Sequence, residues 1–349
     1  MNHSIKADHL NATPVEGTQP LLQVRNLCKY FPVYSQGFVR KEISKIKAVD
    51  QVSFDLMPGE TLGLVGESGS GKTTCARSIL RALRPTSGEV IMNLPDGRRL
   101  DLAQLSNKAL KPLRQQMQMI FQDPYASLNP RMTVGDIVAE PMKIHGLAKG
   151  SELDDRVERI LGKVGLKPEH RHRYPHAFSG GQRQRVGIAR ALIMNPSLVV
   201  ADEAVSALDV SVQAQVINLL GDLQEEFGLT YIFVAHDLSV VRHLCDKVAV
   251  MYAGRIVEMA SSAALFEDPK HPYTRSLLSA VPYPDPDITM EFELGGEVAD
   301  AGNLPSGCSF HPRCKDCFEP CDQRTPQLET MPDGAQVACH LCSQANVSK

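Results

Sequence analysis

A glycine-rich turn that ends in a lysine and two hydroxyls, VGESGSGKTT at residues 65–74, is the first segment that could do chemistry. Glycines let the backbone curl so that its N–H groups point inward, and a helix N-terminus adds partial positive charge. The spacing GxxxxGKT fits the phosphate-binding P-loop. The residues predicted to hold nucleotide phosphates are Gly66, Ser68, Gly69, Ser70, Gly71, Lys72, Thr73 and Thr74.

Two carboxylates supply the remaining groups that Mg²⁺-dependent phosphate chemistry needs. Lys72 is placed to reach the β- and γ-phosphates, and the Thr73 hydroxyl to coordinate Mg²⁺. Asp202 ends the apolar run SLVVAD, where a Walker-B carboxylate binds Mg²⁺. Glu203 follows it and is placed to polarise a water against the γ-phosphate. The sequence therefore predicts an NTPase.

The elements that must position these groups predict an α/β fold. Residues 61–65, 197–203 and 230–237 are short apolar runs typical of buried strands. After the glycine-rich turn, apolar residues recur at spacings of three and four up to Leu83, which predicts a helix that ends before Pro85. Two of the strands end in acidic or imidazole side chains, so we expect polar groups to gather at the carboxyl edge of a sheet.

Composition limits the class of protein. The chain has 349 residues, of which 43% are hydrophobic and 22% charged, so it is globular rather than disordered. A formal net charge of −3 disfavours a nucleic-acid binder. No apolar run approaches the roughly 18 residues that span a bilayer. Residues 1–20 are polar and lack the apolar core of a signal peptide, so we expect a disordered tail.

The segment FSGGQ at 178–182, downstream of a P-loop, resembles the signature of ATP-binding cassette (ABC) ATPases. The resemblance covers residues 21 to about 285 and includes the family's other motifs in order. The matching residues are Gln122 in the Q-loop, Asp209 at the end of the D-loop SALD, His236 as the switch histidine, and Phe31 (with Tyr30 as the alternative) as the aromatic residue that stacks on adenine.

This resemblance implies an ABC-type nucleotide-binding domain at 21–265, with a RecA-like core and a helical subdomain at about 123–190. Two such domains close head to tail around two ATP molecules, and the signature of one contacts ATP bound mainly to the other. The implied catalytic residues are Glu203, His236, Lys72 and Gln122; the implied Mg²⁺ ligands are Thr73, Gln122 and Asp202; and the implied signature contacts are Ser179, Gly180, Gly181 and Gln182.

Three longer segments narrow the resemblance to ATPase subunits of dipeptide and oligopeptide importers, and the oligopeptide subunit fits best. These segments are FQDPYASLNPRMTVGDIVAEP, RYPHAFSGGQRQR and HPYTRSLLSAVPYPDPD. Such a subunit lies on the cytoplasmic face of the bacterial inner membrane. The implied partners are a second, homologous ATPase, two transmembrane permease subunits and an extracytoplasmic solute-binding protein, without nucleic acid. The alternatives are importers of nickel, glutathione or another small solute, a soluble ABC ATPase acting on nucleic acid or ribosomes, and a regulatory subunit that binds ATP without turnover.

Six of the nine cysteines lie in a proline- and glycine-rich extension at 266–349. Without an export signal, a thiol cluster favours a metal site over disulfides. The extension resembles that of peptide-importer ATPases, some of which bind a [4Fe–4S] cluster. Two further hypotheses are zinc held by the pairs Cys314/Cys317 and Cys339/Cys342, and unligated thiols. The implied cluster ligands are Cys308, Cys314, Cys321 and Cys339.

One residue departs from the family pattern, in which proline usually follows the catalytic glutamate. Here the residue is Ala204. Because proline restricts the preceding residue to extended conformations, we expect Glu203 to be held less firmly, or the substitution to be neutral in a rigid strand end. The histidine-rich segment at 169–176 is interpreted as a solvated loop rather than a metal site.

Overall fold

The computed structural model describes residues 19–35, 41–94, 96–280 and 299–347. Nearly all of the predicted N-terminal tail, and all but the first residue of AVPYPDPD (280–287), lie outside the described residues.

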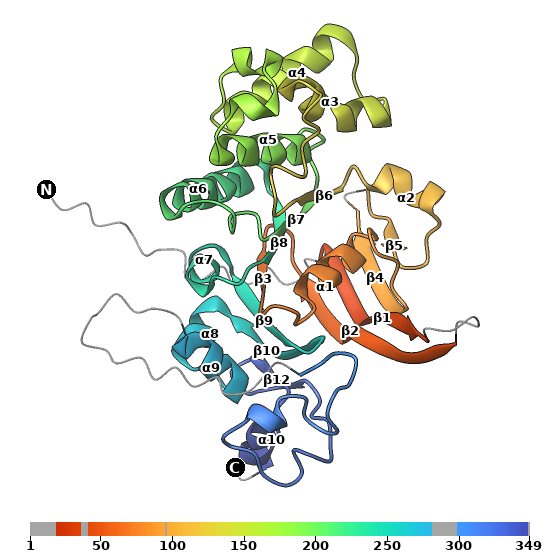
Figure 1. Cartoon of the computed structure of the whole chain (residues 1–349), viewed down its shortest axis with the longest axis vertical. Helices are drawn as coiled ribbons and strands as arrows, with labels where there is room; N and C mark the ends of the chain where they lie inside the picture. The colour runs from red at the N-terminus through yellow and green to blue at the C-terminus, as the bar shows by residue number, and fades with distance from the viewer. Residues whose placement is uncertain (1–18, 36–40, 95, 281–298, 348–349) are drawn as a thin grey trace, which may run out of the picture.

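An eight-stranded sheet runs through the middle of the molecule in the order β11-β12-β10-β9-β3-β8-β7-β6 (Figure 1). The pairs from β6 to β9 are parallel, whereas β10, β12 and β11 are added antiparallel. The strands are β3 (Thr61–Val65), β6 (Met117–Ile120), β7 (Leu198–Asp202), β8 (Thr230–Val234), β9 (Lys247–Tyr252), β10 (Arg255–Ser261), β11 (Glu329–Thr330) and β12 (Gln336–Val337).

The central strands are buried on both faces, as expected for a parallel sheet. Successive residues of β7 therefore enter different cores: Val199 packs in one apolar cluster and Val200 in the other. The first cluster joins the sheet to the helices of residues 134–223, and the second joins it to a smaller sheet. The predicted strands at 61–65, 197–203 and 230–237 are confirmed, with slightly shorter bounds for the last two.

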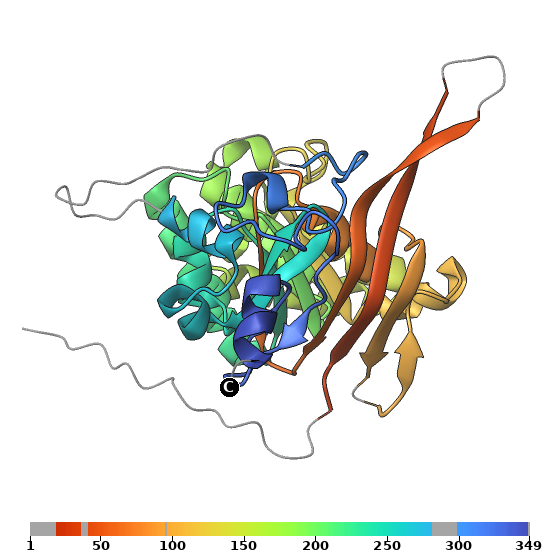
Figure 2. The same cartoon turned by 90° about the horizontal axis from the view of Figure 1, so that it is seen from below.

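The smaller sheet is antiparallel in the order β2-β1-β4-β5. β1 and β2 extend beyond the rest of the molecule (Figure 2). Helix α1 follows β3 and ends at Ile79, short of the expected Leu83, because Arg81 adopts a left-handed backbone with φ 55° and donates to the carbonyls of Leu102 and Leu105. The elements are β1 (Leu22–Tyr34), β2 (Glu42–Leu56), β4 (Ser87–Asn93), β5 (Arg99–Asp101) and α1 (Lys72–Ile79).

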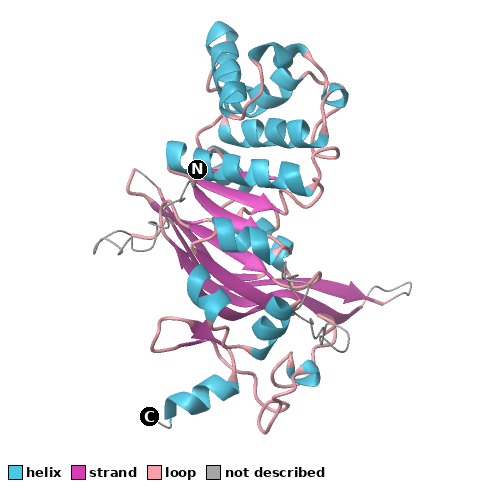
Figure 3. Cartoon of the chain, turned by 90° about the vertical axis from the view of Figure 1, so that its left-hand side faces the viewer, coloured by secondary structure: helices cyan, strands magenta, loops and turns pink. Residues whose placement is uncertain are grey.

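A group of helices covers one end of the molecule, and the C-terminal residues cover the other (Figure 3). The helical end contains α3 (Val134–His145), α4 (Gly150–Lys163), η1 (Pro168–His172), η2 (Pro175–Ala177) and α5 (Gly180–Leu192). The histidine-rich segment forms η1 and η2. The remaining helices are α2 (Asn107–Leu113), α6 (Val210–Phe227), α7 (Leu238–Leu244), α8 (Ser262–Glu267), α9 (Pro272–Ser279), η3 (His311–Arg313) and α10 (His340–Val347).

The C-terminal extension has more regular structure than its composition suggests. α8 spans the boundary that was predicted near residue 265, and α9 follows it. β12 pairs with β10, with Val337 opposite Glu258, so the extension widens the main sheet. The division of the chain into domains stays a prediction.

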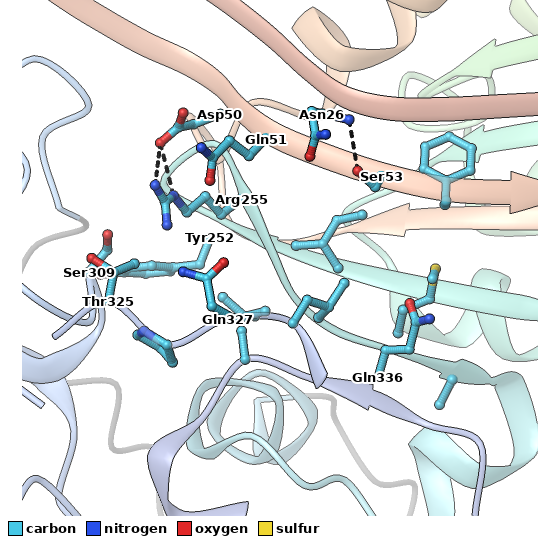
Figure 4. A pocket seen from close by; sticks show the side chains of 18 of the residues that line it. Asn26, Asp50, Gln51, Ser53, Tyr252, Arg255, Ser309, Thr325, Gln327 and Gln336 are labelled. Carbon is cyan, nitrogen blue, oxygen red and sulfur yellow. Dashed lines mark hydrogen bonds and ion pairs between the residues drawn. The ribbon is translucent and has the colours of Figure 1, made fainter. Parts of the chain in front are cut away.

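Asp50 on β2 joins the two sheets. It accepts two hydrogen bonds from Arg255 on β10, at 2.9 and 2.7 Å, and one from the Tyr30 hydroxyl on β1 at 2.5 Å. Burial opposes its ionisation, but these hydrogen bonds outweigh burial and lower the pKa of Asp50. Arg255 and Asp50 line a cavity of about 570 Å³ between β2, β10 and residues 325–338 (Figure 4).

We expect Asp50→Ala to lower the free energy of unfolding by about 3 kcal/mol, because it leaves the Arg255 guanidinium without its buried carboxylate. Urea unfolding of the full chain measures this loss. Asp96→Ala is the matched control, since Asp96 pairs with Arg98 in an exposed loop and its loss should leave the free energy of unfolding almost unchanged. Equal losses in the two variants would contradict a joining role for Asp50.

Candidate functional site

The glycine-rich turn lies between the end of β3 and the start of α1 (Figure 1). Gly71 caps α1 with φ 103°, and a Cβ there would lie 2.1 Å from the carbonyl oxygen of Ala48. Glycine is therefore required for the turn to pass β2. Ser68 and Gly69 are exposed, whereas Ser70 is buried. The turn presents its backbone at a helix N-terminus, which is the arrangement that binds phosphate.

Lys72 folds back over the turn. Its ammonium donates to the carbonyls of Gly66 at 2.7 Å and Glu67 at 2.9 Å. Burial lowers the pKa of Lys72, and the carboxylates of Glu203, Asp202 and Glu67 offset only part of that effect. The lysine is thus a desolvated cation at the centre of the turn, where it interacts strongly with any entering phosphate.

Thr73 and Asp202 meet at the end of β7. The Thr73 hydroxyl donates to Asp202 at 2.8 Å, and Arg77 lies 3.3 Å from the other carboxylate oxygen. Asp202 is 1% exposed. A hydroxyl and a carboxylate in contact are hard oxygen ligands of the kind that Mg²⁺ prefers. This pair fits the predicted metal site.

Glu203 contacts side chains that follow two other strands. Gln122 after β6 donates to its carboxylate at 2.6 Å, and the Nδ1 atom of His236 after β8 lies 3.6 Å from the same oxygen. His236 and Gln122 are exposed, so the group faces solvent. The structure therefore brings together the predicted residues Gln122, Glu203 and His236 at one sheet edge.

The backbone of Glu203 is left-handed, with φ 49°, rather than extended. Its N–H donates to the Val234 carbonyl, and its own carbonyl accepts from the N–H and hydroxyl of Ser206. Ala204 is 1% exposed. The expectation that Ala204 leaves Glu203 less firmly held rested on an extended backbone, which this residue does not have.

Ser179 caps α5 at the helical end of the molecule. Its hydroxyl accepts from the Gln182 N–H at 3.3 Å, and the Gln182 side chain accepts from the Ser179 N–H at 3.1 Å. Ser179 is exposed. These polar contacts lie within one helix cap, so the outward face of the cap is available to an anion from outside the chain.

Two further predicted contacts lie away from this edge. Asp209 caps α6 through the Val212 N–H at 3.0 Å and is exposed, and this hydrogen bond lowers its pKa. On β1 the Tyr30 hydroxyl is bonded to Asp50, whereas the half-buried ring of Phe31 has the Lys29 ammonium 4.8 Å from its centre. The Tyr30 side chain is therefore tied to Asp50, and Phe31 stays the predicted adenine contact.

A small cavity in the extension is lined by the four cysteines of the predicted cluster, together with His271, Phe310, His311 and His340. Cys317 and Cys342 are not among its lining residues. Burial raises the pKa of both Cys308 and Cys314 to about 11. In the part of the chain that the structure describes, no three or more ligating side chains form a group able to hold a metal ion.

Sequence reasoning missed the residues that hold the glycine-rich turn from the extension side. Glu67 in the turn forms an ion pair with Arg313 of η3, and its N–H donates to the Tyr273 hydroxyl of α9. Neither η3 nor α9 has a local pattern that points to the turn. None of the helices in the described residues is both long and apolar enough to cross a membrane.

Family models match most of the chain. The model for ABC transporters matches residues 49–206, and the model for the C-terminal region of oligopeptide/dipeptide transporters matches residues 257–321. The chain is similar to the oligopeptide transport ATP-binding protein AppF of Bacillus subtilis, with 48% identity over 329 residues that cover 93% of this chain and 98% of AppF. A peptide import ATP-binding protein of Brucella ovis is 50% identical over 321 residues, covering 92% and 97% of the two chains.

Solved structures of ABC cassettes share the fold. The dimeric cassette MJ0796, bound to ADP and phosphate, aligns with a TM-score of 0.59 and 29% identity over 69% of this chain and 98% of that chain. The cassette cbiO1 of Clostridium perfringens, part of the transporter complex cbiONQ, aligns with a TM-score of 0.59 and 28% identity, over 71% and 91% of the two chains.

We expect Gly181→Ala to destabilise the contact between α5 and α6 by about 1–3 kcal/mol, because the added Cβ would lie 2.4 Å from a Val212 methyl group. Urea unfolding measures the loss. Val212→Ala in the same chain should recover much of it. Gly180→Ala is the control, since its Cβ meets only Leu208 at an ordinary 3.6 Å. A loss that Val212→Ala leaves unchanged would contradict the steric explanation.

Proposed function

This chain belongs to the oligopeptide/dipeptide importer family of ABC transporter ATPases, and we propose that Glu203 is the residue that activates water in its ATPase reaction. The chain is the ATP-binding subunit of a peptide-import ABC transporter. The contact of Gln122 and His236 with one Glu203 oxygen carries the proposal, because it places a carboxylate, an amide and an imidazole together beside the phosphate-binding turn.

In the proposed reaction the turn at 66–74 holds the phosphates through its N–H groups, with Lys72 on the β- and γ-phosphates. Thr73, Asp202 and Gln122 would supply oxygen ligands for Mg²⁺, and the bound ion would neutralise charge that develops on the phosphates. Glu203 accepts a proton from the attacking water, and His236 orients that water and the γ-phosphate. Phe31 stacks on the adenine ring.

We propose that ATP is bound between two such subunits. Ser179 and Gln182 hydrogen-bond each other in the cap of α5, and Ser179 is exposed. A residue that contacts ATP bound to another subunit must be exposed in this way. Gly180, Gly181 and Asp209 belong to the same interface. A similar cassette, MJ0796, was solved as a dimer with ADP and phosphate. The partner proposed here is a homologous ATPase, which docks with this chain on two permease subunits at the cytoplasmic face of the membrane, supplied by an extracytoplasmic solute-binding protein.

We further propose that the extension carries a [4Fe–4S] cluster on Cys308, Cys314, Cys321 and Cys339. The donor set fits, because these four thiols line one cavity from separate segments while Cys317 and Cys342 do not. The cluster would act as a structural crosslink between the segments that carry the four cysteines.

We expect Glu203→Gln to reduce ATP hydrolysis by the assembled transporter about 100-fold or more, because the water loses its base. Binding of Mg–ATP should persist and the complex should stay in the ATP-bound form. Phosphate release and retained nucleotide are the measurements. Glu225→Gln, an exposed carboxylate on α6, is the control. Near-normal hydrolysis in Glu203→Gln would assign the base to another residue.

We expect the full chain, purified without oxygen, to be brown and to contain about four irons and four sulfides. Cys314→Ser should lose colour and iron, because the half-buried thiol is one of the four proposed ligands, whereas Cys317→Ser should keep both. Metal analysis and visible absorption measure this. Colourless protein that holds zinc, and loses it in Cys317→Ser, would support the paired-cysteine site instead.

A further inference from the structure

Arg313, from the C-terminal extension, binds the phosphate-binding turn through Glu67. Arg313 in η3 donates to both carboxylate oxygens of Glu67, at 2.8 and 3.0 Å, although 246 positions separate the two residues. The Arg313 side chain is 5% exposed and that of Glu67 is 19% exposed. A two-pronged guanidinium–carboxylate contact fixes the orientation as well as the distance of its partner.

An aromatic surround holds Arg313 in place. Its guanidinium lies 5.8 Å from the centre of the Tyr252 ring and 5.9 Å from that of Phe310, and it also bonds the Tyr252 hydroxyl at 3.5 Å. Tyr273 packs against both rings and accepts the Glu67 N–H at 2.9 Å. The extension therefore holds Glu67 by its side chain and by its backbone.

Holding Glu67 restrains the part of the turn that must bind phosphate. Lys72 donates to the carbonyls of Gly66 and Glu67, so the peptide groups on either side of Glu67 set where the ammonium lies. Ser68 and Gly69, which follow, are exposed. A turn of glycines and serines loses much conformational entropy when it closes on a ligand. Because Glu67 is already fixed, less entropy remains to be lost when the ligand binds.

The cysteine-rich segment determines where Arg313 lies. The Cys314 N–H donates to the His311 carbonyl, the His311 N–H to the Cys308 carbonyl, and the Cys308 N–H to the Cys321 carbonyl. These backbone hydrogen bonds fix η3 between Cys308 and Cys314. Arg313, the last residue of η3, contacts the turn.

We propose that Arg313 is a positioning residue for ATP: through Glu67 it keeps the phosphate-binding turn in the conformation that binds nucleotide. This inference rests on the proposed role of the turn in binding ATP. Arg313 touches no reacting atom, and it acts on affinity for nucleotide rather than on the chemical step.

The test is Mg–ATP binding by the full chain carrying Arg313→Met, which keeps bulk among the rings but removes the two hydrogen bonds. We expect the Kd to rise about tenfold, a size typical of coupled sites. Amide hydrogen exchange of residues 66–72 should be faster in the variant before nucleotide is added. In the assembled transporter the KM for ATP should rise while kcat changes little.

Three further variants separate positioning from general stability. Arg98→Met, which breaks an exposed arginine–carboxylate pair with Asp96, should leave the Kd unchanged. Arg313→Lys keeps the charge but not the fork, so an intermediate Kd is expected. Glu67→Gln should weaken binding, and its combination with Arg313→Met should be no worse than the weaker-binding single variant, because both remove one contact.

Two results would overturn the inference. One is an Arg313→Met chain with a lower melting temperature but the same Kd and exchange rate as Arg98→Met. The other is strictly additive effects of the Arg313 and Glu67 substitutions. If instead the unaltered chain fails to bind Mg–ATP, the proposed function fails, which is a separate outcome.

Discussion

Parallel pairing of β6, β7, β8 and β3 is the constraint on which the site depends, because it carries four separate segments to one edge of the sheet. The glycine-rich turn follows β3 and Glu203 follows β7. Gln122 and His236 follow β6 and β8, so a register of backbone hydrogen bonds fixes their separations. A slip of one residue in β7 would move each of its side chains, including that of Asp202, to the other face of the sheet.

The left-handed backbone at Glu203 shows how much of this edge is imposed by its surroundings. A non-glycine residue at φ 49° costs on the order of 1–3 kcal/mol and persists only when neighbours require it. Here the requirement comes from the bond to Val234 on one side and from Ser206 on the other. Neither Val234 nor Ser206 is the residue that follows Glu203, so this backbone conformation does not depend on a proline at position 204.

Short-range chemistry explains which features were predictable from sequence. The turn at 66–74 and the cap at Ser179 each need particular residue types within a few positions, and the buried strands need continuous apolar runs. The early end of α1 was missed because Arg81 is held by carbonyls about twenty positions away. β12 has two residues and owes its existence to β10 rather than to its own sequence. Arg313 was missed for the same reason, since its partner is distant in sequence.

The extension contacts the ATP-binding edge directly, because Arg313, which lies between its cysteines, binds Glu67 of the phosphate-binding turn. Coupling between two sites is reciprocal. If the Arg313–Glu67 contact favours nucleotide binding, bound nucleotide must in turn stabilise that contact. The route is short: Cys308 and Cys314 bracket η3, η3 carries Arg313, and Arg313 holds Glu67. A crosslink among the cysteines, as proposed above, would reduce the freedom of η3, and part of that restraint would pass through Arg313 to the phosphate-binding turn.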